Sequence, residues 1–443
     1  MSKPGGINTK GVEDFLRETV QSGDTVLAAV SGGADSMVML SLLLEVRETL
    51  GIRVEVVHIH HHLRAASDAE WQFVENFCTS HGVPFHGRHI DVPGAQARDG
   101  HSMEATAHRL RYNAFREVMA DCGAQWIALA HHANDRAETL LMNLLRGTSG
   151  HGLAAMSARN GAMIRPLLSF TREDIEAYGK AKGMEWVNDE SNNDTTILRN
   201  RLRHELLPTL ASYNPNIVAA LNRLAESSEW EQDYIDASAQ ALYKQAVVFY
   251  AKKWCLLERA PLLEAHKAVV AALLRARVEK MSASRHALRF EMIEQVLLLL
   301  QEGHGRYDLG DGVLFECTGR YVYIGEVPTG EWRRDEAGFS HEFLEARLEG
   351  MGNTPLAVRF PQSGDVVFLE KVGHKRLKKI FQEKGLPSVL RGVWPLIYDI
   401  KTKEVIWVPF LARTTLLMYY NSVTFSEVNP NITIAGQSER LTF

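Results

Sequence analysis

The segment AVSGGADS (29–36) combines residue types that are suited to chemistry on a phosphate. It follows a continuous apolar run, TVLAAV (25–30), and precedes a helical pattern. Paired glycines allow positive φ and a close approach of the backbone to a ligand, and the unpaired N–H groups of a turn and a helix N-terminus bind anions. The segment therefore predicts a phosphate-binding loop that consists of Ser31, Gly32, Gly33, Ala34, Asp35 and Ser36.

Asp35 adds a carboxylate to this loop, and carboxylate oxygens suit a Mg²⁺ ion that is held against phosphates. The loop is not a Walker A sequence, because GxxxxGK[ST] is absent, and it is not GxGxxG. The alternative is a plain glycine-rich turn between a strand and a helix, in which Asp35 or Ser36 serves only as a cap.

The segment AHHANDRAET (130–139) is a second candidate for chemistry. Asp135 and Glu138 are three residues apart, so they share one face of a helix, and His131 and His132 directly precede this helix. The two carboxylates would hold Mg²⁺ or an amine. An acidic helix N-terminus that complements the helix dipole is the alternative, but it does not explain two adjacent histidines at a strand end.

Short β-rich runs alternate with helical patterns over the first 200 residues, which predicts an α/β fold with a doubly wound parallel sheet. Ligands bind such sheets beyond the carboxyl ends of the strands, at the point where the strand order reverses. Both candidate segments follow expected strands. We expect strands at 25–30, 53–59, 84–92 and 126–132, and helices at 36–50, 67–81, 102–121 and 134–146.

The rest of the chain predicts two further domains. Residues 200–303 are expected to be almost wholly helical, with a break at Asn214-Pro215. Short strands follow from about 305, and a small α+β domain begins near 355 and includes a basic helix at 375–385. The predicted domains are 1–212, 213–345 and 350–443.

Composition narrows the class of protein. The 443 residues carry a net charge of −5, so contacts with nucleic acid must come from local basic patches. The four cysteines form no CxxC pair, which argues against disulfide frameworks and thiolate metal centres. No apolar run reaches the ~18 residues of a membrane span, and the N-terminal residues lack the apolar run of a secretory signal. A cytoplasmic enzyme without a membrane partner is expected.

SGGADS after the first strand resembles the PP-loop of the ATP pyrophosphatase superfamily. Further segments resemble one branch of it, the tRNA(Ile)-lysidine synthetases, over nearly the whole chain and least within 215–345. His108, Asn134 and Leu198 depart from the usual pattern of this family. The segments that carry the resemblance are SMEATAHRLRY (102–112), AHHANDRAET, RGTSGHGLAAM (146–156), IRPLL (164–168), VNDESNNDTTILRNRLRHELLP (187–208), HKRLKKIFQEKGLP (374–387) and VIWVP (405–409).

The resemblance implies an N-terminal PP-loop catalytic domain followed by two tRNA-binding domains. It also implies an activity, the ligation of free L-lysine to C2 of the wobble cytidine of a tRNA(Ile) with a CAU anticodon. The C2 oxygen would attack the α-phosphate of ATP, pyrophosphate would leave, and the ε-amino group of lysine would then displace AMP. ATP and Mg²⁺ are the implied cofactors, and no transition metal is expected.

Residue roles follow from the matching positions. Residues Ser31 to Ser36 and His58 would bind ATP, and Asp35 and Asp135 would hold Mg²⁺. The implied catalytic residues are Asp35, Arg111, Asp135 and His131, with His131 or His132 as a candidate base. The implied lysine-binding residues are Asp135, Glu138 and His132. The implied tRNA-binding residues are Arg199, Arg201, Arg203, Lys375, Arg376, Lys378 and Lys379.

The histidine cluster HIHHHLR (58–64) raises the question of a metal site, because imidazole is a common metal ligand. No cysteines or carboxylates accompany it at metal-ligand spacing. His58 and His61 match the family pattern, whereas His60 and His62 replace an acidic or amide residue and a glycine. The cluster is therefore interpreted as a wall of the ATP pocket.

Three questions stay open. A PP-loop enzyme that thiolates tRNA shares the loop, although such enzymes commonly need catalytic cysteines at strand ends. A tRNA-binding protein with a degenerate nucleotide site is a rival from another class, and Asn134 favours it slightly. The oligomeric state is undecided, with a homodimer as one option.

Overall fold

The computed structural model describes residue 7 and residues 9–60, 67–99, 102–148, 150–187, 194–251, 253–282, 288–328, 356–369, 372–408 and 411–413. The chain divides into two compact units, Met1–Gln232 and Asp233–Phe443, and each is described by itself. The division into three domains stays a prediction. Within the described residues, no helix combines the length and apolar character that crossing a bilayer requires.

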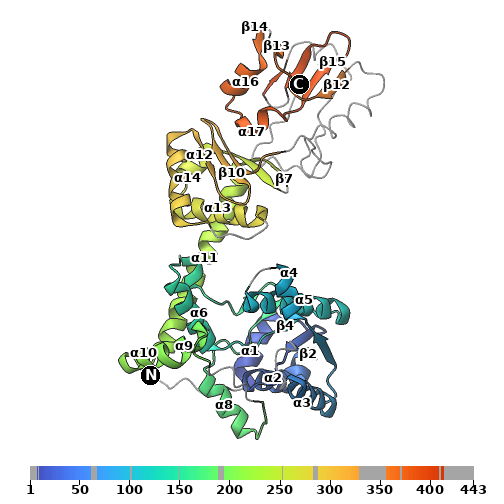
Figure 1. Cartoon of the computed structure of the whole chain (residues 1–443), viewed down its shortest axis with the longest axis vertical. Helices are drawn as coiled ribbons and strands as arrows, with labels where there is room; N and C mark the ends of the chain where they lie inside the picture. The colour runs from blue at the N-terminus through green and yellow to red at the C-terminus, as the bar shows by residue number, and fades with distance from the viewer. Residues whose placement is uncertain are drawn as a thin grey trace. The chain divides into compact units, whose positions relative to one another are not determined.

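A six-stranded sheet with the order β3-β2-β1-β4-β6-β5 forms the centre of the first unit (Figure 1). All neighbouring strands are parallel except β5 and β6, which form an antiparallel pair. The predicted α/β fold with a parallel sheet is confirmed. Its strands are β1 (Thr25–Ala29), β2 (Arg53–His60), β3 (Phe85–His89), β4 (Trp126–Ala128), β5 (Arg159–Asn160) and β6 (Met163–Ile164).

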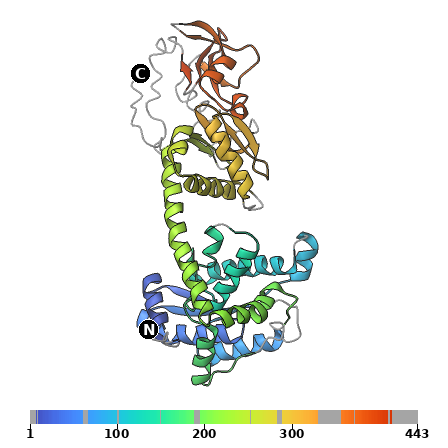
Figure 2. The ribbon, with the colours of Figure 1, turned by 90° about the vertical axis from the view of Figure 1, so that its left-hand side faces the viewer.

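The helices expected in this unit are present, with ends that differ by one or two residues. The unit also contains a π-helical turn, η2, and the first part of the long helix α11, which Figure 2 shows as one continuous helix. The helical elements are α1 (Thr9–Thr19), α2 (Ala34–Leu50), α3 (Ser67–Ser80), α4 (Val92–Asp99), α5 (Met103–Cys122), α6 (Ala133–Leu145), α7 (Gly150–Leu153), α8 (Arg172–Ala181), α9 (Leu198–Arg201), η2 (Leu202–Leu206), α10 (Leu207–Tyr213) and α11 (Ile217–Ala246).

Strand β1 is apolar from Val26 to Ala29, as expected for a strand whose two faces are both covered by helices. Val26 and Ala28 belong to one core cluster with α1, α2 and α3, whereas Leu27 belongs to a second cluster with Phe115 and Val118 of α5. Successive side chains of a strand point to opposite faces, so the sheet lies between two helical layers. This burial fixes where β1 ends and the predicted phosphate loop begins.

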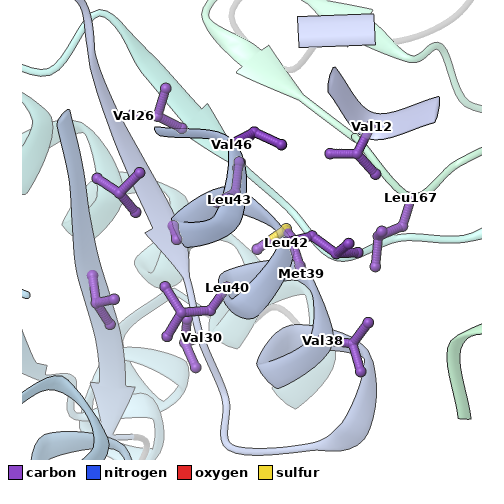
Figure 3. Packing of buried hydrophobic residues seen from close by; sticks show 14 of the residues in the cluster. Val12, Val26, Val30, Val38, Met39, Leu40, Leu42, Leu43, Val46 and Leu167 are labelled. Atoms are coloured by element: carbon purple, nitrogen blue, oxygen red, sulfur yellow. The ribbon is translucent and has the colours of Figure 1, made fainter. Parts of the chain in front are cut away.

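Helix α2, which follows the loop, is buried on most of its circumference. Met37, Leu40 and Leu43 are fully buried, and Figure 3 shows Val12 of α1 and Leu167 among the side chains gathered around this helix. The helix dipole and first N–H groups of α2 are therefore held at a fixed place by packing on several sides.

Local signals in the sequence set several helix ends correctly. Thr171 and Asp174 have the spacing of a capping box in the sequence, and they form one at the start of α8. Gly183, which follows this helix, has a positive φ of 65°. The break at Asn214-Pro215 separates α10 from α11.

Two sheets with flanking helices make up the second unit. The strands of one sheet follow the order β7-β8-β11-β10-β9, and those of the other follow β12-β15-β16-β13-β14, with β17 paired to β16. The strands are β7 (Val247–Ala251), β8 (Trp254–Glu258), β9 (Gly305–Asp308), β10 (Val313–Cys317), β11 (Tyr321–Glu326), β12 (Leu356–Arg359), β13 (Val366–Leu369), β14 (Gly373–Arg376), β15 (Leu396–Asp399), β16 (Val405–Val408) and β17 (Ala412–Arg413). The helices are α12 (Arg259–Glu264), α13 (Lys267–Met281), α14 (Phe290–Glu302), α16 (Leu377–Glu383) and α17 (Ser388–Arg391).

The two sheets of this unit share a core. Trp254 and Tyr323 of the first sheet belong to one buried cluster with Trp394 and Leu396 of the second part. The carboxylate of Glu316 also accepts a hydrogen bond from the N–H of Ser388 at 2.7 Å. Apolar packing therefore joins the middle and the C-terminal parts of the chain.

The expectation of an almost wholly helical segment at 200–303 is wrong at 247–258, where β7 and β8 form an antiparallel pair. β8 also pairs with β11, whose partner residues lie more than sixty positions later in the sequence. Pairing at such a separation leaves no local signal, and the sequence between the two strands has no Asn-Gly or Asp-Gly pair, which is typical of a short hairpin.

The expected basic helix at 375–385 begins later than expected. Lys375 and Arg376 lie on β14, where they pair with Val367 and Val366 of β13, and the helix α16 starts only at Leu377. Pairing with β13 therefore overrides the helical pattern at these two positions. The strand-like run NITIA (431–435) lies outside the described residues.

Replacement of Gly32 by alanine should lower the free energy of unfolding of the first unit by about 1 kcal/mol, because Gly32 has a φ of 92° that alanine adopts only with strain. A Cβ atom here would meet its nearest neighbour at 3.5 Å, so the cost is conformational rather than steric. Gly33→Ala is the matched control, since Gly33 has a φ of −77°. Equal shifts in the urea midpoints of both variants would contradict this explanation.

Candidate active site at the carboxyl ends of β1 and β4

A pocket of about 480 Å³ opens where β1 and β4 end. The chain runs from β1 to β2 on one side of the sheet and reaches β4 on the other, so the pocket lies at the reversal point where doubly wound sheets bind ligands. Its volume is in the range of small-molecule sites. The polar residues that line it are Ser31, Asp35, Ser36, His58, Glu70, Arg111, Tyr112, His131, Asp135, Arg199, Asn200 and Arg203.

The loop after β1 is shaped by its own serines. The N–H of Ser31 donates to Oγ of Ser36 at 3.1 Å, and the hydroxyl of Ser36 donates to the carbonyl of Gly33 at 3.0 Å. Gly32 supplies the positive φ, and its carbonyl accepts from the N–H of Val187 at 3.0 Å. Gly33 caps α2 without a side-chain hydrogen bond, so the first N–H groups of this helix remain for an anion.

Asp35 is the carboxylate that the pocket leaves least satisfied. Its Oδ1 atom is buried and has no hydrogen-bond partner among the described residues, while Oδ2 lies 3.7 Å from Nε2 of His132. Burial raises the pKa of Asp35, and the nearby Asp135 adds to this effect. A buried acceptor without a donor is costly unless a ligand completes it, and a cation would do so.

Asp135 and His132 form a capping box at the start of α6. Oδ2 of Asp135 accepts from the N–H of His132 at 3.0 Å, and Nδ1 of His132 accepts from the N–H of Asp135 at 3.4 Å. Although burial alone would raise it, His132 and Arg199 hold the pKa of Asp135 below its ordinary value. Asp135 is therefore an ionised carboxylate whose position is fixed by the helix start.

Glu138 lies one turn further along α6, and its side chain is 0% exposed. Arg199 donates to it through Nε at 2.7 Å, and Arg203 donates through Nε at 2.6 Å and Nη2 at 3.1 Å. Arg199 also reaches Oδ1 of Asp135 at 2.9 Å. Two carboxylates thus hold two arginines at the pocket wall, an arrangement called here the α6 ion-pair network.

His131 lines the pocket as a neutral imidazole. Burial, together with Arg165, lowers its pKa to about 4 despite the opposing effect of Asp135. Nδ1 of His131 accepts a hydrogen bond from Nε of Arg165 at 3.2 Å. A neutral imidazole that accepts at Nδ1 carries its proton at Nε2, so His131 is a hydrogen-bond donor in this state.

Arg111 comes from α5 and brings a further cation to the pocket. Burial and the nearby Arg199 lower the pKa of Arg111, but an arginine stays charged at neutral pH. Arg111, Arg199 and Arg203 all line the pocket, and guanidinium groups suit the phosphates of a nucleotide. The charges of Arg199 and Arg203 are partly balanced by Asp135 and Glu138.

His58 and His60 lie two residues apart on β2, so their side chains share one face of the sheet, but they have different neighbours. His58 lines the pocket, and its Nδ1 donates to the carbonyl of Val30 at 2.8 Å. His60 packs against Trp71 and His89, and its Nε2 donates to Asp68 at 3.1 Å. His61 and His62 lie outside the described residues.

Comparison with known proteins agrees with this geometry. A PP-loop domain model matches residues 8–210, and a TilS substrate C-terminal domain model matches residues 356–414. A tRNA(Ile)-lysidine synthase from Thermotoga sp. (strain RQ2) is 30% identical over 90% of this chain and 94% of its own length. The chain belongs to the tRNA(Ile)-lysidine synthase family. Within this family, the synthase from Geobacter sulfurreducens is 30% identical over 87% of this chain and 88% of its own. The synthase from Pseudomonas fluorescens is 33% identical over 84% of this chain and 86% of its own length.

The structure of this family member brings most predicted site residues to one pocket. Gly32, Ala34, His132 and Glu138 do not line it. His132 and Glu138 contact residues that do, because His132 bonds to Asp135 and Glu138 bonds to the two arginines. Arg199 and Arg203, expected to contact tRNA, lie at the pocket, whereas Arg201 is exposed. The roles of all these residues stay predictions.

The C-terminal residues expected to bind tRNA belong to the second unit. Lys378 and Lys379 are exposed, as is Arg376. Lys375 is half-buried and forms an ion pair with Glu383.

Sequence reasoning missed Arg165 and Tyr112 as site residues. Arg165 follows a strand in IRPLL (164–168) and orients His131, and Tyr112 stands beside Arg111. Both lie in segments that carry the family resemblance. The resemblance therefore indicated these segments, but the contacts of the two side chains could not be predicted from it.

Replacement of Glu138 by glutamine should lower the free energy of unfolding by about 3 kcal/mol, because two arginines would then face one remaining carboxylate in a buried place. The control is the solvent-exposed ion pair of Glu13 and Arg17. Glu13→Gln should change the free energy of unfolding by less than about 0.5 kcal/mol. Urea unfolding measures both. If Glu138→Gln were as stable as Glu13→Gln, the network would not contribute as described.

Proposed function

We propose that the protein ligates free L-lysine to C2 of the wobble cytidine at position 34 of a tRNA(Ile) with a CAU anticodon. ATP is cleaved to AMP and pyrophosphate in the reaction. The observation that carries the proposal is the pocket at the reversal point, where a phosphate loop, an unsatisfied Asp35 oxygen and three arginines converge. The names of the relatives support the choice of substrate.

The first step is an adenylation. The C2 oxygen of the cytidine attacks the α-phosphate of ATP, an O–P bond forms, and the bond to the leaving pyrophosphate breaks. The loop of Ser31 to Ser36 presents backbone N–H groups to the pyrophosphate, and Arg111 neutralises charge that develops on the transferring phosphate. These groups are positioned before the reaction, so they stabilise the transition state with little reorganisation.

A magnesium ion fits the residues at the mouth of the loop. Asp35 would hold it through Oδ1, which otherwise has no partner among the described residues. Asp135 fits less well, because Oδ1 already accepts from Arg199 and Oδ2 from the N–H of His132. The ion would supply charge neutralisation at the phosphates.

In the second step the ε-amino nitrogen of lysine attacks C2, a C–N bond forms, and AMP leaves with the oxygen that cytidine carried. The ionised carboxylate of Asp135 binds the amino group of lysine, and the proton released from this amine passes to solvent. With a pKa of about 4 and its proton at Nε2, His131 is better suited to donate a hydrogen bond to a substrate than to act as the base. Glu138 acts through Arg199 and Arg203 rather than on lysine directly.

Binding of tRNA is assigned to exposed cations in both units. Arg201 in the first unit, and Arg376, Lys378 and Lys379 in the second, are exposed. Phosphate contacts by such residues release counterions and supply much of the affinity for nucleic acid. A cytoplasmic location, where tRNA is found, is part of the proposal.

The direct test is incubation of the protein with ATP, labelled lysine and tRNA(Ile) of CAU anticodon, followed by nucleoside analysis at position 34. Asp35→Ala should lower kcat/KM by about 10²–10³-fold and leave tRNA affinity within twofold. The exposed Asp14→Ala, on α1, is the matched control and should keep full activity. Unmodified cytidine with the wild-type protein would contradict the proposal, as would full activity of Asp35→Ala.

The double change Lys378→Glu and Lys379→Glu should weaken tRNA binding at least tenfold and reduce the slope of log K against log salt, because phosphate contacts are lost. The change Lys401→Glu and Lys403→Glu reverses the same amount of charge in the same unit and serves as control. Filter binding at several salt concentrations measures both. Identical slopes for the two variants would refute a specific contact by α16.

A further inference from the structure

Three residues of the first unit form a cluster near the amino-terminal ends of β2 and β3, whereas the pocket lies at the carboxyl ends of the strands. They are Glu55 near the start of β2, His86 near the start of β3 and Cys122 at the end of α5. One ligand atom of each lies within 4.8 Å of the others. Cys122 is eleven positions after Arg111 on α5, which places the cluster roughly 16 Å along the helix from the pocket wall. The proposed activity does not use it.

We propose that Glu55, His86 and Cys122 bind one divalent transition-metal ion of the zinc class. A thiolate, an imidazole and a carboxylate are the ligand types that Zn²⁺ takes, and three protein ligands leave a fourth position for water. Tetrahedral bonds of about 2.0–2.3 Å put ligand atoms roughly 3.3–3.8 Å apart. Movements of side chains by about 1 Å would therefore complete the site.

The local fold holds the three side chains in place. Glu55 and His86 are 18% and 25% exposed, and Nε2 of His86 donates to Oε2 of Glu55 at 2.7 Å. Arg88 of β3 pairs at 2.7 Å with Asp121, the neighbour of Cys122, and so fixes the end of α5 against β3. An ion can reach the cluster because each of its members is partly exposed.

In the metal-free protein Glu55 accepts a hydrogen bond from His86, and the Cys122 thiol lies beside the same carboxylate. On metal binding the thiol would lose its proton to solvent and His86 would exchange its hydrogen bond to Glu55 for a bond to the metal. The site would then link α5, which carries Arg111, to β2 and β3.

Titration of the full-length, chelator-treated protein with Co²⁺ tests the proposal, because a thiolate–cobalt bond gives a charge-transfer absorption. One equivalent should produce this band in the wild-type protein, and Zn²⁺ should displace it. All four cysteines are described, and Cys78, Cys255 and Cys317 are buried, so the band reports on Cys122. Zn²⁺ should also raise the melting temperature.

Cys122→Ser should abolish the band, and His86→Ala and Glu55→Gln should each weaken Co²⁺ binding at least tenfold. Cys78→Ser and the exposed His81→Ala are the matched controls and should bind like the wild type. Circular dichroism checks that each variant is folded. Absence of the band in the wild-type protein would overturn the proposal, as would its persistence in Cys122→Ser. Neither result depends on catalytic activity, so this test is separate from that of the proposed function.

Discussion

The α6 ion-pair network is the interaction on which the candidate site depends. Burying the carboxylate of Glu138 completely is costly unless cations and hydrogen bonds compensate it, and Arg199 and Arg203 do so at 2.7 and 2.6 Å. The same contacts bring α9 and η2 against α6, where Leu202 and Ala137 share a core cluster. These ion pairs thus pack α9 and η2 against α6 and place two guanidinium groups at the pocket.

The network also explains why the two carboxylates of α6 have different roles. Asp135 is tied to the helix start by His132 and lines the pocket, whereas Glu138 does not line it and is fully buried against the arginines that it holds. Their separation by three residues, which the sequence shows, places them on one face of the helix. Only the packing of η2 against that face decides which carboxylate remains accessible to a substrate.

Much of the first unit could be predicted from the sequence because its signals are local. The apolar run of β1, the glycines of the loop and the capping box at Thr171 each act within a few residues, and the structure confirms all three. The positions of β7 and β8 were missed because they depend on pairing with β11 far along the chain. The same reason hides the Glu55–His86–Cys122 cluster, whose members meet only after the sheet and α5 have packed.

The proposed function requires the pocket to adenylate a tRNA base rather than lysine. Exchange of labelled pyrophosphate into ATP measures the reversal of this step without the second substrate. The expected exchange requires tRNA(Ile) with a CAU anticodon and proceeds without lysine. Exchange supported by lysine in the absence of tRNA, or no exchange with tRNA present, would contradict it.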